Sequence, residues 1–326
     1  MAGNVDAPDG AAGSVPLAIE ARGLVKRFDG FAAVDGVDIA VPEGAIYGIL
    51  GPNGAGKTTT LRMLLGIIDP DSGTRRILGA DRPHDVATRI GYLPEERGLY
   101  PAMKAVDAIA FVGALRGLPL KAGRVRGREL LEEHGLGYAA DRQIRQLSKG
   151  MAQQVQILGT LVHKPRLVVF DEPFSGLDAL NQGRLERMMR GLAENGTTVI
   201  FSTHVIAHAE RLCDEVAIIA GGKVPFAGSV DVARDRIPAQ VRLETRAADG
   251  PWRAALPADA RHEGQFWYFS LPETGIEPLL RALIEGEAGI LSLSIERAGL
   301  HDAFVAIAGE AAARALEEET PVEQKR

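Results

Sequence analysis

The segment Gly51–Thr58 (GPNGAGKT) constrains this chain more than any other, because it matches the phosphate-loop pattern of Gly, four residues, then Gly-Lys-Ser/Thr. A short apolar run, Ala45–Leu50, precedes it, and a helical pattern begins at Lys57. Glycines let the backbone curl so that successive N–H groups converge on phosphate oxygens, and the helix adds its positive N-terminal end. Lys57 can reach the β- and γ-phosphates, and the Thr58 hydroxyl can ligate Mg²⁺. The pattern therefore predicts a nucleotide site between a buried strand and a helix.

Two adjacent carboxylates, Asp171 and Glu172, directly follow the apolar run Leu167–Phe170. A strand end is where the second carboxylate on the magnesium side of a phosphate-loop protein belongs, so Asp171 is expected to hold the metal shell. Glu172 is then placed to orient or deprotonate water. Taken alone, an Asp-Glu pair at a strand end is more often solvated surface, so this prediction depends on the loop before it.

Further apolar runs alternate with helical patterns along much of the chain. Val199–Phe201 is a third such run, after Ala45–Leu50 and Leu167–Phe170. Together the three runs indicate a mostly parallel sheet covered on both faces. The stretch Leu17–Val41 instead alternates apolar and polar residues, which is typical of antiparallel strands. Glu215–Gly228 predicts a hairpin that turns at Gly221-Gly222.

The character of the chain changes after about Ile237, where Pro and Gly separate short strand-like runs from two helical stretches. The first residues are rich in Ala, Gly, Asp and Pro, and the last are charged, so both ends are expected to be loose. We expect a disordered tail at residues 1–16 and an α/β domain at 17–237, whose helical part covers about 87–163. A small α+β domain at 238–311 and a charged tail at 312–326 are expected to follow.

Composition narrows the possible partners. The chain has 326 residues with 37 Lys and Arg against 43 Asp and Glu, a formal net charge of −6, which argues against nucleic acid as the main partner. It has no run of about 20 mostly apolar residues that would cross a bilayer and no secretory signal at its start. Cys213 is its single cysteine, which fits a reducing compartment and excludes an intrachain disulfide.

Kinases, GTPases and helicases share the phosphate loop, so the other motifs decide between them. Leu147–Met151 (LSKGM), the signature segment, precedes Asp171-Glu172-Pro173, which continues into Ser175–Asp178 (SGLD), and Phe201–His204 (FSTH) ends the next strand. The chain lacks the Asn-Lys-x-Asp guanine motif of GTPases. In this order, over about Leu17–Gly228, the motifs resemble the ATP-binding subunit of ABC transporters. The resemblance implies an α/β P-loop ATPase fold with a mixed sheet core, an antiparallel β subdomain and a helical subdomain.

The resemblance also implies roles at the matching positions. Phe28 would stack on adenine, His204 would contact the γ-phosphate and support the attacking water, and Glu172 would act as base. Ser148 and Gly150 would contact the γ-phosphate bound to another subunit, and Asp178 would link the two sites. The residues expected to hold ATP in the loop are Gly51, Pro52, Asn53, Gly54, Ala55, Gly56, Lys57, Thr58 and Thr59.

One phosphate loop and one signature segment supply only half of each composite site. The family resemblance therefore predicts a head-to-tail dimer that closes over two ATP molecules, formed by two copies or with a paralogous ATPase subunit. A separate multi-span permease would complete the transporter. The chain is then expected at the cytoplasmic face of the cell membrane.

The sequence departs from the common family pattern at two places. The signature segment has Lys149 and Met151 where Gly and Gln are usual, and Glu95 stands where the family usually has Gln. Glu95 is still a candidate Mg²⁺ ligand beside Thr58 and Asp171, although it adds negative charge near the phosphates. These variants and the C-terminal extension look like the subgroup of sodium-export and drug- or antibiotic-export ATPases.

Two alternative functions remain open, and so does one local interpretation. A soluble ABC ATPase that acts on ribosomes or DNA is the main rival. Such proteins usually have tandem cassettes or coiled-coil insertions, and this sequence has neither a second phosphate loop nor a heptad run. A regulatory module without hydrolysis is weaker, because Glu172 and His204 are both present. The segment Leu93–Met103 is expected to line the groove that receives the membrane subunit, or else to pack within the helical subdomain. The transported substrate is not readable from this chain.

Overall fold

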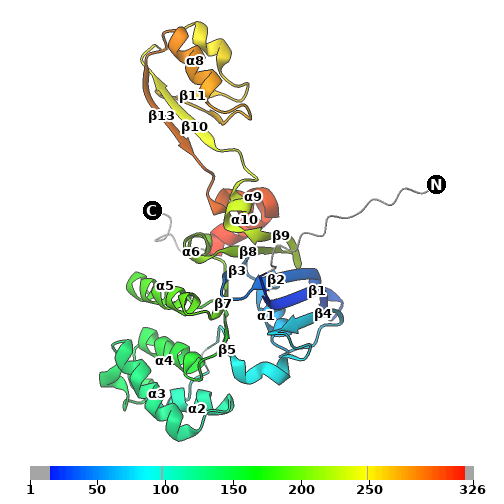
Figure 1. Ribbon diagram of the computed structural model, residues 1–326, viewed down its shortest axis with the longest axis vertical. Helices are drawn as coiled ribbons and strands as arrows, with labels where there is room; N and C mark the ends of the chain where they lie inside the picture. The colour runs from blue at the N-terminus through cyan, green and yellow to red at the C-terminus, as the bar shows by residue number, and fades with distance from the viewer. Residues whose placement is uncertain (1–14, 97, 248, 320–326) are drawn as a thin grey trace, which may run out of the picture.

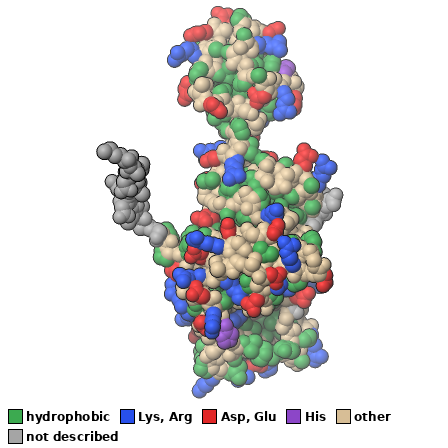
Figure 2. All heavy atoms as spheres, turned by 90° about the vertical axis from the view of Figure 1, so that its right-hand side faces the viewer, with side chains coloured by type: hydrophobic (Ala, Val, Ile, Leu, Met, Phe, Trp, Pro, Cys, Tyr) green, Lys and Arg blue, Asp and Glu red, His purple; other side chains and the backbone are tan. Residues whose placement is uncertain are grey.

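The computed structural model describes residues 15–96, 98–247 and 249–319. A larger body, which contains two sheets and most of the helices, carries a smaller lobe at one end (Figure 1). The space-filling view in Figure 2 shows that a narrow neck joins the lobe to the body.

The main sheet of the body has six strands. They are β3 (Ile46–Leu50), β5 (Ile90–Leu93), β6 (Leu167–Phe170), β7 (Thr198–Thr203), β8 (Glu215–Ala220) and β9 (Lys223–Ser229). Their order is β5-β6-β7-β3-β8-β9, and every neighbouring pair is parallel except β8 and β9, which form an antiparallel hairpin. The predicted mostly parallel sheet and the predicted hairpin are confirmed.

An antiparallel sheet lies beside the main sheet. Its strands are β1 (Leu17–Phe28), β2 (Phe31–Pro42) and β4 (Ser72–Ile77), in the order β2-β1-β4, as the alternating pattern of the first two predicts. Together with helix α1 (Lys57–Leu64) it buries one face of the main sheet. Tyr47 and Ile49 of β3 point into this cluster, whereas Ile46 and Leu50 point into the cluster on the opposite face. Burial on both faces explains why the central strands are apolar throughout.

The opposite face of the main sheet is covered by helices. These are α5 (Ala179–Glu194), α6 (Ile206–Leu212) and α7 (Val230–Arg234). The helical subdomain stands at the far end of the body from the lobe (Figure 1). It contains α2 (Ala105–Leu115), α3 (Leu120–Glu133) and α4 (Lys149–Leu161), with short 3₁₀ turns η2 (Gly137–Ala139) and η3 (Ile144–Gln146).

The region expected to be helical, residues 87–163, also contains a strand. Ile90–Leu93 forms β5, after the 3₁₀ turn η1 (Pro83–Arg89), and pairs in parallel with β6 at the edge of the main sheet. Four apolar or small residues carry no periodicity that separates a strand from a helix, so the partner strand decides the conformation.

The lobe is a small α+β unit. It contains β10 (Gln240–Thr245), η4 (Pro251–Ala255), β11 (Arg261–Glu263), β12 (Phe266–Ser270), α8 (Glu277–Glu285) and β13 (Ile290–Glu296). The strands form one antiparallel sheet in the order β11-β12-β10-β13. Its own core includes Leu243, Trp267 and Leu283, which are at most 6% exposed.

The last two helices differ from the expected domain limits. Helices α9 (Leu300–Ala308) and α10 (Glu310–Glu319) pack on the body, where Phe304 is fully buried and Leu316 is 3% exposed. The lobe therefore ends near Glu296, not at residue 311, and the part of the expected charged tail up to residue 319 is helical. Apolar residues spaced by three or four positions give each helix one face that the body can bury. The expected loose ends at residues 1–14 and 320–326 lie outside the described residues.

Candidate nucleotide site

The phosphate loop joins the fully buried β3 to α1, as the sequence predicts. Gly56 has a φ of 105°, and a Cβ there would lie 2.5 Å from the carbonyl oxygen of Ala33, so only glycine fits. The loop curls around a cavity of about 300 Å³, the loop cavity. Gly51 and Ala55 are buried within the loop. The loop residues that line the cavity are Pro52, Asn53, Gly54, Gly56, Lys57, Thr58 and Thr59.

Lys57 is nearly buried at the start of α1, with a side chain that is 5% exposed. Its ammonium group donates hydrogen bonds to the carbonyl oxygens of Gly51, at 2.7 Å, and Pro52, at 3.2 Å. It also lies 3.1 Å from Oε1 of Glu172. A buried ammonium needs such partners, because desolvation without them is costly. These contacts hold a positive charge at the wall of the loop cavity.

Asp171 and Thr58 meet where β6 ends and α1 begins. Thr58 Oγ1 donates to Asp171 Oδ1 at 3.0 Å, and Ser202 Oγ donates to the same oxygen at 2.6 Å. Asp171 Oδ2 is buried and has no hydrogen-bond partner among the described residues. Burial raises the pKa of Asp171, and the hydrogen bonds from Ser202 and Thr58 oppose this shift. A carboxylate and a hydroxyl with one unsatisfied oxygen fit a hard divalent cation such as Mg²⁺.

Glu172 follows at the same strand end, in a strained backbone conformation with a φ of 46°. Its N–H donates to Ser202 Oγ at 2.9 Å, and its Oε2 lies 3.0 Å from His204 Nδ1. Burial alone would raise the pKa of Glu172, but the hydrogen bond with His204 and the charge of Lys57 outweigh it, so the pKa is lower than usual. An ionised carboxylate held between an imidazole and an ammonium group can orient water and accept its proton.

Glu95 lies where two cavities meet. It lines the loop cavity with Lys57, and it lines a second cavity of about 140 Å³ with Asp171 and Gln153. Burial raises the pKa of Glu95, and the negative charges of Asp171 and Glu172 raise it further. The structure therefore brings a third carboxyl group beside the two that follow β6.

The signature segment and Asp178 both begin helices. Ser148 caps α4, the helix that contains Gly150, by accepting a hydrogen bond from the Met151 N–H at 3.2 Å. Ser148 lines a separate cavity of about 310 Å³ with Lys149. Asp178 caps α5, because its Oδ1 accepts from the Asn181 N–H at 2.9 Å. None of these signature or capping residues lines the loop cavity of the same chain.

Phe28 is the last residue of β1. It is 47% exposed, and the Lys26 ammonium lies 5.8 Å from its ring centroid. The ring does not line the loop cavity, although Ala33 of the neighbouring strand does. An exposed aromatic face can stack on a planar base. The contact between Phe28 and adenine stays a prediction.

Two residues of the site were not singled out from the sequence. Ser202 bonds both Asp171 and Glu172, as described above. Gln153 lines the second cavity, and its Nε2 donates to the Pro173 carbonyl at 2.7 Å. The position of Ser202 had a signal, since parallel pairing of the two predicted strands places the residue after Phe201 beside the residue after Phe170.

One further observation limits what the site can hold, and a second concerns membrane-spanning helices. Within the described ranges, no group of three or more His, Cys, Asp or Glu side chains is arranged to hold a metal ion. A cation at Thr58 and Asp171 would therefore need oxygens from its nucleotide as well. Across the same ranges, no helix is long and apolar enough to cross a membrane.

A glycine loop between a buried strand and a helix, with carboxylates at the end of another strand of the same sheet, defines a phosphate-loop nucleotide-binding domain. The family model described as ABC transporter matches residues 34–175. The chain is 33% identical over 323 residues to the daunorubicin/doxorubicin resistance ATP-binding protein DrrA of Streptomyces peucetius, which covers 94% of this chain and 97% of that protein. It is 31% identical over 296 residues to an uncharacterized ABC transporter ATP-binding protein, YhaQ, of Bacillus subtilis, with 86% and 95% covered.

Solved structures agree with these relatives. An ATP-binding subunit of an ABC transporter matches with a TM-score of 0.61 and 30% identity, over 67% of this chain and 92% of that one. CbiO1 from Clostridium perfringens matches with a TM-score of 0.60 and 26% identity, over 68% and 92%. The chain therefore belongs to the family of ABC transporter ATP-binding subunits, whose members bind and hydrolyse ATP, dimerise and act with membrane permeases. The fold class predicted from the motifs is confirmed.

Proposed function

We propose that this chain hydrolyses MgATP as a closed dimer and so drives a separate membrane permease in export. The observation that carries the proposal is the contact of Glu172 with both His204, at 3.0 Å, and Lys57, at 3.1 Å. The Thr58–Asp171 pair lies beside them. A proton acceptor, Glu172, and a positive charge, Lys57, thus line the loop cavity together with Thr58, one of the proposed cation ligands.

The residues divide the work of hydrolysis between them. Lys57 and the N–H groups of the loop bind the phosphates of ATP. Thr58, Asp171 and Glu95 would hold Mg²⁺, which when bound neutralises charge on the phosphates. Glu172 orients the attacking water and accepts its proton, and His204 holds the Glu172 carboxylate in place while contacting the γ-phosphate.

A head-to-tail dimer follows from where the signature segment lies. Ser148 and Gly150 begin α4, away from the loop cavity of their own chain. A second copy, or a paralogous subunit, would place these residues on the γ-phosphate from the other side, with Asp178 at the junction. ATP would then favour the closed dimer because it contacts both subunits only in that state.

A permease would bind at the helical subdomain. Hydrophobic side chains gather at this end of the molecule in Figure 2, and Tyr100 is 59% exposed, with its ring edge-on to Phe111. Leu99 and Met103 pack instead against the core of the helical subdomain, as the alternative interpretation predicts. Through such a permease the chain would sit at the cytoplasmic face of the membrane.

Export is supported by the relatives. Besides DrrA, the Nod factor export ATP-binding protein I of Ralstonia nicotianae is 38% identical over 66% of this chain and 68% of that protein. Both relatives are named for resistance or export. Export is also the direction expected from the resemblance of Glu95 and Lys149 to the sodium-export and drug- or antibiotic-export subgroup.

The test is purification of the tagged full chain from membranes of its own host, with its partners identified by mass spectrometry. We expect a multi-span membrane protein, and ATP hydrolysis by the reconstituted pair. Lys57→Ala should lose ATP binding and hydrolysis but keep the membrane partner. Recovery with ribosomes or DNA would favour the soluble rival, and no hydrolysis by the wild type would favour a regulatory module.

A further inference from the structure

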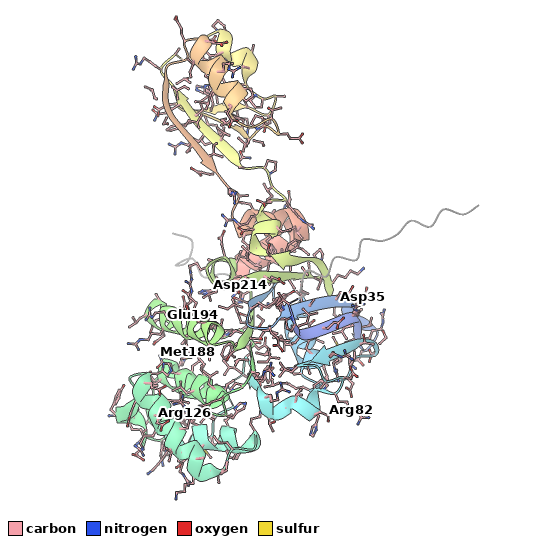
Figure 3. All side chains as sticks on the ribbon, in the orientation of Figure 1. Asp35, Arg82, Arg126, Met188, Glu194 and Asp214 are labelled. Carbon is pink, nitrogen blue, oxygen red and sulfur yellow. The ribbon has the colours of Figure 1, made fainter. Side chains whose placement is uncertain are left out.

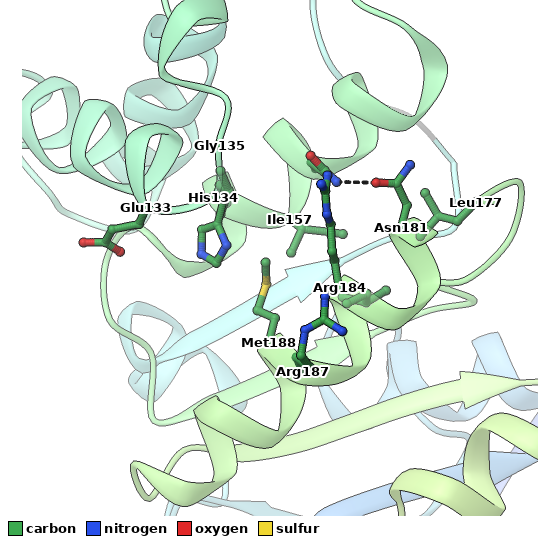
Figure 4. Close-up of a pocket in the computed structure, with 12 residues that line it drawn as sticks. Glu133, His134, Gly135, Ile157, Leu177, Asn181, Arg184, Arg187 and Met188 are labelled. Carbon is green, nitrogen blue, oxygen red and sulfur yellow. Dashed lines mark hydrogen bonds between the residues drawn. The ribbon is translucent and has the colours of Figure 1, made fainter. Parts of the chain in front are cut away.

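A cavity of about 480 Å³ lies outside the nucleotide site, between the helical subdomain and α5 (Figure 4). One wall comes from the end of α3 and from α4, and the other comes from α5 and the turn before it. The apolar side chains that line it are Ile157, Leu158, Leu177, Leu185 and Met188.

The cavity marks the junction of two hydrophobic cores. Leu158 belongs to the core of the helical subdomain, whereas Leu185 belongs to the core of the body. Met188 packs against both cores and is labelled on α5 in Figure 3. The cavity shows that the side chains leave space at this junction, and methionine is a flexible side chain that can move to accommodate an apolar guest.

The charge at this cavity is positive. Arg184 and Arg187 approach it from α5 (Figure 4), and among the described residues neither guanidinium has an ion-pair or hydrogen-bond partner. Glu133 on the opposite wall is paired with Arg126 at 3.1 Å. Burial lowers the pKa of His134, the other titratable side chain of this wall, which therefore adds no charge at neutral pH.

We propose that this cavity binds a small amphipathic carboxylate, with its apolar body between α4 and α5 and its head group on Arg184 and Arg187. The volume lies in the range of small-molecule sites, about 300–1,000 Å³. The guanidinium fork matches a carboxylate in two parallel hydrogen bonds, and the buried apolar lining takes up the alkyl or aryl part. This inference does not depend on the proposed transport function.

The occupant would touch the segment that follows the nucleotide site. Leu177 and Asn181 line the cavity, and Asn181 is bonded both to the Asp178 cap and, at 2.8 Å, to Gln154 of α4. A ligand here contacts the helical subdomain and the body at once. It is therefore expected to raise the melting temperature of the whole chain.

The experiment compares three probes with the same ten-carbon chain by titration calorimetry on the full chain. These are decanoate, decanol and decyltrimethylammonium, each kept below its micelle concentration. We expect one decanoate per chain, bound about tenfold or more tightly than the other two, because only its head can bond the arginines. The variant Arg184→Gln with Arg187→Gln should bind decanoate about as weakly as decanol and bind decanol as the wild type does.

Two further variants separate the site from general effects. Lys121→Gln removes an exposed charge of α3 away from the cavity and should change none of the three affinities. Met188→Trp should fill the cavity and abolish binding of both decanoate and decanol, with circular dichroism used to check that it folds. Equal affinity of the wild type for decanoate and decyltrimethylammonium would overturn the proposal. So would unchanged decanoate affinity in the double arginine variant, or no saturable binding of any probe.

Discussion

The ammonium nitrogen of Lys57 lies 3.1 Å from Oε1 of Glu172, and both side chains are at most 6% exposed. The group proposed to hold phosphate is thus paired with the group proposed to activate water. The phosphates of ATP would compete with Glu172 for the charge of Lys57. Removing the charge of Glu172 should therefore affect ATP binding and ATP hydrolysis in different directions.

We expect Glu172→Gln to bind ATP at least as tightly as the wild type, because the substitution removes the carboxylate that competes for Lys57. Hydrolysis should fall by about 10²–10⁴-fold, the usual contribution of a general base, and the ATP-bound dimer should accumulate. Nucleotide titration, phosphate release and gel filtration measure these three quantities. Glu194→Gln, at an exposed site near the end of α5, is the matched control. Normal turnover by Glu172→Gln would exclude Glu172 as the base.

The lobe should be removable, because its two ends meet. Gln240 and Glu296 are paired across β10 and β13, so their Cα atoms are about 5 Å apart. We expect excision of residues 241–295, closed by a short Gly-Ser linker, to leave a folded chain that still binds ATP. Thermal unfolding and nucleotide titration check this expectation.

Phe304→Ala is the contrasting variant for that experiment. Its ring is fully buried in the body, so the substitution should cost about 3–5 kcal/mol of the free energy of unfolding. If the excised chain does not fold while Phe304→Ala is as stable as the wild type, the assignment of α9 to the body is wrong.

The stability of the body should depend on pH through His208. Its imidazole is 2% exposed and stacks on Phe174 with ring centroids 4.0 Å apart. Burial lowers its pKa, and the hydrogen bond with Glu186 only partly opposes this shift. The unfolded chain therefore binds a proton at a higher pH, near 6.5, than the folded chain does. This contribution to stability is present above about pH 6.5 and is lost as the pH falls below it.

The measurement compares the free energies of unfolding of the wild type and His208→Gln at pH 7.5 and pH 5.5. Glutamine cannot titrate, so the advantage of the wild type should shrink at the lower pH. Taking the difference between the two proteins removes the contributions of groups that do not contact residue 208, such as Glu95, whose pKa is raised. An advantage that stays constant between the two pH values would contradict a neutral, buried His208.

Much of the nucleotide site was predictable because its parts are local. The phosphate loop, the Asp171-Glu172 pair and the capping Ser148 each lie at the boundary of one strand or helix. Their residue types follow from backbone conformation, helix capping and phosphate chemistry, which act over a few residues. The sequence around a strand-to-helix turn of this composition is therefore enough to predict a nucleotide site there.

The tertiary structure alone decided how the distant parts meet. The pairing of Lys57 with Glu172 joins residues that are far apart in the chain, and the return of α9 to the body fixes where the lobe ends. The cavity beside Met188 exists because two separate cores meet there. An apolar helix face can be buried against many surfaces, so its periodicity shows that the helix is packed and does not show what it packs against.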